Sequence, residues 1–198
     1  FNANVSDIFR NNYVSPRPSS TTLQIPTQGI GEWCHGTYCP EITDSVFRSL
    51  AVGDRFDVEG IPFATPQHGK NIAFVSLWDN YPSALTIPVK AQKASVAHIL
   101  LAGSTNHMQT HMDNAIIIAN YKDGTSDTLH LIPPFNYCPI EQDFYVDGKA
   151  FQTVEPRPVR ICLATGTVSR NLGTALSIQS DEVYGREIPG GAAQLLSM

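Results

Sequence analysis

The sequence predicts an all-β protein, a jelly-roll-like β-sandwich with few short helices. Fourteen glycines and fourteen prolines divide the 198 residues at short intervals, and both residue types interrupt regular structure. The runs between them are short and rich in β-branched and aromatic residues, a composition typical of strands. Because these runs recur along the chain with turn signals between them, we expect two layers of strands around an apolar interior.

The few helical signals lie toward the N-terminus. Short helices are expected at residues 6–13, where Ser6 is a suitable N-cap, and at residues 43–50. Two prolines shortly before residue 21 favour an extended backbone. We therefore expect an N-terminal extension or linker at residues 1–20 and a single β-sandwich domain at residues 21–198.

The strands follow in order along the chain. They are expected at Thr21–Pro26, Asn71–Trp78, Ala84–Val89, Ser95–Ala102, Ala115–Tyr121, Thr128–Ile132, Val159–Ala164 and Thr174–Gln179. Ser95–Ala102 and Ala115–Tyr121 are apolar enough to be buried on both faces. The turn Lys122–Thr125 contains Asp-Gly, which tolerates the positive φ that a tight hairpin needs.

Composition limits the classes of partner. Charged residues make up 16% of the chain, against about 25% in a typical globular domain. The polar surface must therefore rely on hydroxyl and amide side chains, which suit neutral, hydroxyl-rich ligands. The net charge is −5 and no two basic residues are adjacent, which argues against nucleic acid as a partner. No apolar run approaches the roughly 20 residues that span a bilayer.

Cysteine usage and the ends of the chain bear on its location. Four cysteines in 198 residues are too few for a disulfide scaffold. Cys34 and Cys39 are close enough to close a small loop, although the pairing stays open, and Cys162 lies in an apolar run where a buried thiol is expected. The chain opens at Phe1 without Met, and we expect a fragment of a longer secreted or periplasmic protein.

The polar loop at residues 103–114 is the first candidate for function, because it joins two strongly apolar strands. Its amides can each form paired hydrogen bonds with hydroxyl groups, and aromatic side chains near loops can stack on the C–H faces of a sugar. Burial of Trp78 in the core and a turn-capping role for Asp79 are open alternatives. The candidate ligand-binding residues are Trp78, Asp79, Tyr81, Asn106, His107, Gln109, Asn114 and Tyr137.

Metal and catalytic sites receive weaker support. His107 and His111 have the spacing of a helical zinc site, but the segment is expected to be a loop and no Glu follows His107. The group Cys34, His35 and Cys39 lacks a second ligand pair. No metal ligand or catalytic residue is therefore assigned. Carboxylates that could serve a glycosidase, whose two acids must flank the scissile bond, are Asp79, Asp113, Glu141, Asp143 and Asp147.

A set of motifs resembles a known kind of domain. The segments that carry it are Gly60–Phe63, Asn71–Pro82, Ala102–Asn106, Tyr121–Thr125 and Ile140–Asp143, in this order. Together they resemble uncharacterised galactose-binding-like β-sandwich accessory domains of large secreted bacterial proteins related to glycoside hydrolases. The resemblance covers about residues 54–165 and implies carbohydrate binding through loops at one end, beside a catalytic domain. It also implies a structural calcium in many members, but no oxygen cluster here matches such a site residue by residue.

These observations favour a non-catalytic accessory module of a larger carbohydrate-active protein, with no cofactor of its own. Its expected partner is a carbohydrate, bound weakly, or a neighbouring domain of the same chain. One alternative is a glycoside hydrolase fragment or a metal-dependent hydrolase built on His107 and His111. Another is a purely structural module between domains.

Overall fold

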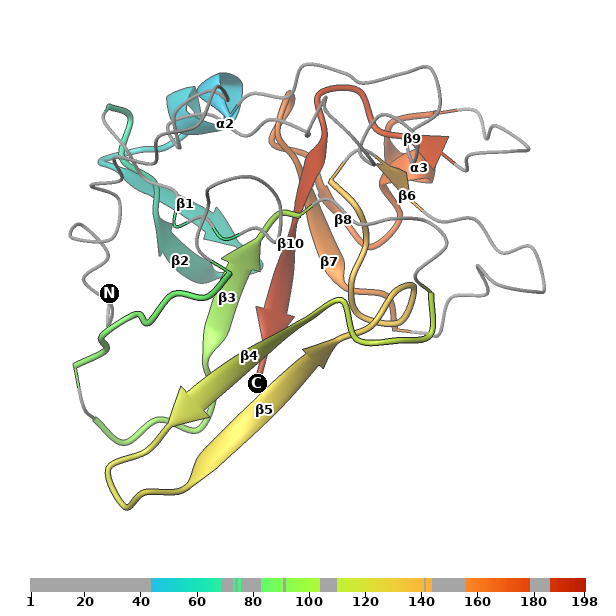
Figure 1. Cartoon of the computed structure of the whole chain (residues 1–198). Coiled ribbons are helices and arrows are strands. Elements are labelled where there is room, and N and C mark those ends of the chain that lie inside the picture. Colours follow the sequence, from blue (N-terminus) through green and yellow to red (C-terminus); the bar gives the residue numbers. More distant parts are fainter. Residues whose placement is uncertain are drawn as a thin grey trace.

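The computed structural model describes residues 44–68, 73, 75, 83–90, 92–103, 110–140, 142–143, 156–178 and 186–198. Within these ranges the chain consists mostly of antiparallel strands with two short helices (Figure 1), which confirms the all-β prediction. The predicted helix at residues 6–13 and the strand Thr21–Pro26 lie outside the described residues. Of the predicted strand Asn71–Trp78, only Ala73 and Val75 are described.

A four-stranded antiparallel sheet forms the centre of the fold. Its strands are β3 (His98–Leu101), β10 (Ala192–Ser197), β7 (Val159–Cys162) and β8 (Val168–Ser169), in that order. Every residue of β7 is buried, as are the first five of β10. Side chains alternate between the two faces of a sheet, so both faces of this pair must be covered.

The first face is covered by a hairpin and a helix. Strands β1 (Arg55–Val58) and β2 (Ile61–Ala64) are joined by two residues with positive φ, Glu59 at 49° and Gly60 at 80°. This is the turn geometry that matches the twist of a two-residue hairpin. Helix α2 (Ser45–Ser49) lies beside them and confirms the helix predicted near residues 43–50. The shared core consists of Phe47, Val58, Ile140, Val159, Ile161, Leu163, Ala193 and Leu195.

The second face is covered by different elements at its two ends. Helix α3 (Leu172–Ala175) packs against Cys162 and Ala192, and Cys162 is a fully buried thiol, as predicted. At the other end the β4–β5 hairpin brings Leu131 onto Leu196. A short pair, β6 (Gln142–Asp143) with β9 (Arg186–Glu187), completes the described strands.

The hairpin of β4 (Ala115–Asn120) and β5 (Ser126–Leu131) matches its predicted position. Its turn is confirmed as well: Gly124 has a φ of 87°, and the Tyr121 N–H donates to the Thr125 carbonyl at 2.9 Å. The prediction that Ala115–Tyr121 is buried on both faces is wrong. Ile116 and Ile118 are 51% and 49% exposed, because only the inner face of the hairpin packs on the central sheet.

The predicted strand at Thr174–Gln179 is also wrong, since α3 occupies its first residues. The Asn171 side chain caps the helix by accepting a hydrogen bond from the Thr174 N–H at 3.1 Å. Leu172 and Leu176 are four residues apart, so the helix places both against the same core cluster. This local hydrogen bond and the helical spacing outweigh the β-propensity of the segment.

Two further differences concern strand positions. The segment predicted as strand Ala84–Val89 forms only a single bridge, at Val89. Strand β10 is absent from the predicted strands, although it is the strand that joins β3 to β7. The signal for it was the turn before it. Pro189 is followed by Gly190 at φ 77°, and the Gly191 N–H donates to the Ile188 carbonyl at 2.9 Å, which is a type II turn.

Candidate functional site

The polar loop at residues 103–114 is described at its two ends, as Gly103 and residues 110–114. Of the eight predicted site residues, Asn114 and Tyr137 are described. The other six lie outside the described residues: Trp78, Asp79, Tyr81, Asn106, His107 and Gln109. The described ends nevertheless show how the loop is attached to the fold.

The first end of the loop rests on the segment Pro133–Ile140, which we call the anchor segment. The Gly103 carbonyl accepts a hydrogen bond from the Ile140 N–H at 2.7 Å. The ring of Tyr137 lies directly against Gly103, where an added Cβ would overlap the Tyr137 hydroxyl. A residue without a side chain is therefore needed at this point of close approach.

The second end of the loop is attached to the same anchor segment. The His111 N–H donates to the Pro133 carbonyl at 2.7 Å. The His111 ring meets Phe135 edge to face, with ring centroids 4.9 Å apart, an arrangement that aromatic rings favour. The Asn114 N–H then donates to Leu131 at 2.9 Å, where β4 begins.

Buried polar side chains hold the anchor segment on the central sheet. Gln194, in the middle of β10, accepts a hydrogen bond from the Cys138 N–H and donates one to the Asn136 carbonyl, both at 3.0 Å. On the neighbouring strand, Arg160 donates to the Pro139 carbonyl at 2.6 Å. Both side chains are fully buried, and buried polar groups of this kind fix a backbone position because leaving them unpaired is costly.

Asn136 links the anchor segment to β5. Its side-chain oxygen accepts from the Ile132 N–H at 2.8 Å, and its side-chain nitrogen donates to the His130 carbonyl at 2.7 Å. The loop, the anchor segment and the base of the hairpin are thus joined by one set of hydrogen bonds. A long polar loop on such a fixed frame is typical of binding sites.

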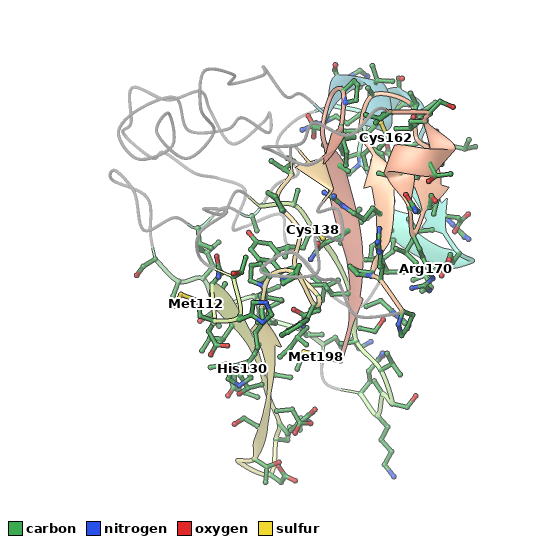
Figure 2. The ribbon with its side chains drawn as sticks, turned by 90° about the vertical axis from the view of Figure 1, so that its right-hand side faces the viewer. Met112, His130, Cys138, Cys162, Arg170 and Met198 are labelled. Carbon is green, nitrogen blue, oxygen red and sulfur yellow. The ribbon has the colours of Figure 1, made fainter. Side chains whose placement is uncertain are left out.

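A polar pair lies on the surface where the loop meets the hairpin. His130 Nδ1 is 2.7 Å from Asp113 Oδ2, and both side chains are about half exposed. A carboxylate only accepts hydrogen bonds, so Nδ1 is the donor in this contact, and Nε2 takes no part in it. Figure 2 shows His130 and Met112 in the same region of the molecule, distant from Cys162 and Arg170. Hydroxyl donors and apolar C–H groups both find partners on such a surface.

The two described candidates have clear local roles. Asn114 donates from its side chain to the Met112 carbonyl at 3.1 Å. Tyr137 was expected to be half-exposed beside a loop, but it is only 7% exposed, because its ring fills the cluster with Leu131 and Leu196. In this position Tyr137 supports the base of the loop and presents no ring face to solvent. Its predicted role in ligand binding stays a prediction.

The described residues contain no group of three or more His, Cys, Asp or Glu side chains able to hold a metal ion. His111 is described, but His107 and the trio Cys34, His35 and Cys39 are outside the described residues. In the described part of the chain, no helix has both the length and the apolar character needed to cross a membrane.

Comparison with known proteins identifies no relative: no family model matches the chain, and no curated protein or solved structure matches it. The site is therefore argued from its own geometry. Sequence reasoning missed His130, Asn136 and Gln194. Strand alternation could have found His130, because it lies on the same face of the hairpin as Ile116. Nothing in the local sequence around Gln194 marks it as a buried bridge.

Proposed function

We propose that this chain is a non-catalytic accessory module of a larger secreted carbohydrate-active protein, and that it binds glycan weakly or supports a neighbouring catalytic domain. The proposed architecture is a jelly-roll β-sandwich of galactose-binding-like type. The glycan would bind at the rim formed by the loop at residues 103–114 and the base of the β4–β5 hairpin. The structural calcium implied by the resemblance is not part of this proposal.

The observation that carries the proposal is the attachment of both ends of the loop to one anchor segment. Gly103 contacts its C-terminal part and His111 contacts its first residue. Two ends that are already held in place lose little conformational freedom when a ligand binds beside them, so weak polar contacts can suffice.

The surface beside the loop fits a neutral sugar. Asp113 offers acceptor oxygens for hydroxyl groups, and His130 offers a ring nitrogen as a further polar partner. Met112, at the end of the loop, and Ile116, in β4, are both about half exposed and offer apolar contacts close to Asp113 in the sequence. The low proportion of charged residues in the chain is in keeping with an uncharged ligand.

A glycan array followed by isothermal titration calorimetry tests the proposal. We expect weak binding by the wild type and its loss in Asp113→Ala. Asp57→Ala is the matched control, because Asp57 is an equally exposed carboxylate that also forms a 2.7 Å ion pair, with Arg55. The control variant should bind like the wild type.

Three results would count against the proposal. Absence of binding to every glycan tested would favour a purely structural role between domains. Equal binding by Asp113→Ala and the wild type would place any site elsewhere. Turnover of nitrophenyl glycosides by the chain alone, abolished by removal of zinc, would favour the hydrolase alternative.

A further inference from the structure

We propose that the free edge of β4 pairs with β4 of a second copy of this chain, forming a two-fold symmetric dimer through a continuous sheet. The proposal rests on three features of β4. Its edge is unprotected, its outward backbone groups are oriented for pairing, and its sequence around Ile117 reads the same in both directions. It does not depend on the proposed glycan binding, although Ile116 belongs to both surfaces.

The edge of β4 differs from the edges of β1, β2 and β8. Exposed edges are usually protected by charged residues, proline or short length. Strand β1 carries Arg55 and Asp57, β2 carries Pro62, and β8 has only two residues. Strand β4 has six residues and contains neither charge nor proline. Among the described residues its one strand partner is β5.

The backbone of β4 is oriented for pairing on that edge. The Tyr121 N–H donates to the Thr125 carbonyl across the hairpin, and hydrogen-bonded pairs alternate along an antiparallel ladder. Counting back from Tyr121, the residues that bond to β5 are therefore the odd-numbered ones. The N–H and C=O groups of Ile116 and Ile118 consequently point away from β5, toward the free edge.

The sequence of β4 is symmetric about Ile117, reading Ala-Ile-Ile-Ile-Ala from residue 115 to residue 119. A two-fold axis through Ile117 places Ile116 opposite Ile118 of the second copy, and the reverse. The residues brought together are those whose backbone groups point outward, so each of these two pairs can form both hydrogen bonds of an antiparallel ladder. A register shifted by one residue would not satisfy this condition.

Side chains support the same register. Ile116 and Ile118 are about half exposed on the outer face, and the symmetric pairing gathers both residues of each copy into one apolar row. Cross-strand pairs of β-branched residues stabilise a sheet. The residues opposite them on β5 are the more polar His130 and Thr128, so pairs of two isoleucines form only between copies. In a closed two-fold interface the β4 edges of the two copies pair with each other, so neither β4 edge is left for a third copy.

Sedimentation equilibrium over a range of protein concentrations tests the dimer. The wild type should rise from the 21.6 kDa of one chain toward twice that mass. Ile118→Lys should remain at the mass of one chain, because it brings two positive charges together beside the axis. Thr128→Lys is the matched control, since it lies directly opposite on the same exposed face but on β5, and it should associate like the wild type.

An independent variant uses the position on the axis. Ile117→Cys places two thiols at a non-hydrogen-bonded pair, where Cα atoms are about 4.5 Å apart, and mild oxidation should produce a covalent dimer. Ile99→Cys, on another partly buried strand position, should not. The proposal is overturned by a wild type that stays at the mass of one chain, by equal effects of the two lysine substitutions, or by a lack of cross-linking at position 117.

Discussion

Strands β10 and β4 have six residues each, but their surroundings are opposite. Strand β4 contains three consecutive isoleucines, yet most of its residues are exposed. Strand β10 contains the amide of Gln194, yet five of its six residues are buried. The difference follows from position. In the described part of the chain, β10 has a strand on each side and elements on both faces, whereas β4 has one strand partner and one covered face. Burial here is set by the number of neighbours rather than by hydrophobicity.

The largest expected effect is the difference in unfolding free energy between isoleucine substitutions in the two regions. Ile161, beside β10, is fully buried, and Ile118 is half exposed. Ile161→Ala should lower the free energy of unfolding by about 3 kcal/mol, because it removes buried methyl groups and leaves a cavity. Ile118→Ala should change it by less than about 0.5 kcal/mol. Urea unfolding at low protein concentration measures both, and similar losses would contradict the comparison.

A second prediction concerns the buried amide of β10. Gln194→Leu makes the core more apolar, but it removes the partners of the Cys138 N–H and the Asn136 carbonyl. Leaving such groups unpaired should cost about 2 kcal/mol of unfolding free energy. The matched control is Thr128→Leu at an exposed position of the hairpin, which should hardly change the free energy of unfolding. A stabilised Gln194→Leu variant would show that the anchor segment does not depend on this bridge.

The contact at the base of the loop gives a third prediction. Gly103→Ala forces a Cβ into the space of the Tyr137 hydroxyl, and overpacking of this kind should cost about 1–2 kcal/mol. In a Tyr137→Phe background the same substitution should cost less, since the hydroxyl is gone. A double-mutant cycle measures the coupling. Equal costs in both backgrounds would mean that overlap with the Tyr137 hydroxyl is not the source of the lost stability.

Sequence reasoning succeeded where the signal is local. The Asp-Gly turn fixed the β4–β5 hairpin, and the apolar run at Val159–Cys162 identified a buried strand. It failed where the outcome depends on distant partners. Nothing within Ala192–Ser197 shows that it lies between two strands, and nothing within Ala115–Asn120 shows that one face is uncovered.

The candidate site divides in the same way. The loop at residues 103–114 was recognisable from its polar composition between apolar strands. Its support was not, because Gln194 is far in sequence from the backbone groups of Asn136 and Cys138 that it holds. Tyr137 was recognised as important, but for exposure that it does not have. Contacts between remote segments are set by the fold as a whole, and a single sequence carries no direct record of them.

The smallest expected effect lies in the exposed hairpin turn, where hydrogen bonds alter ionisation more than stability. The pKa of Asp123 is lowered because its carboxylate accepts hydrogen bonds from the Thr125 hydroxyl at 2.7 Å and the Thr125 N–H at 3.0 Å. A carboxyl whose pKa is lower in the folded state adds stability above its unfolded pKa, and that stability is lost as the pH falls through the folded value. Thr125→Ala removes the hydroxyl and should raise the pKa of Asp123 toward its ordinary value.

An NMR titration followed at the side-chain carboxyl carbons and at the tyrosine Cζ carbons measures the pKa values of Asp123 and Tyr121. The pKa of Tyr121, which is raised by its hydrogen bond to Asp127, should stay where it is in Thr125→Ala and serves as the control. Because the turn is fully exposed, solvent screens these charges and the free energy of unfolding at neutral pH should hardly change. An unchanged pKa for Asp123 would mean that the Thr125 hydroxyl does not lower it. A loss of stability as large as that of Gln194→Leu would mean that the hairpin turn resembles the buried sheet more closely than its exposure indicates.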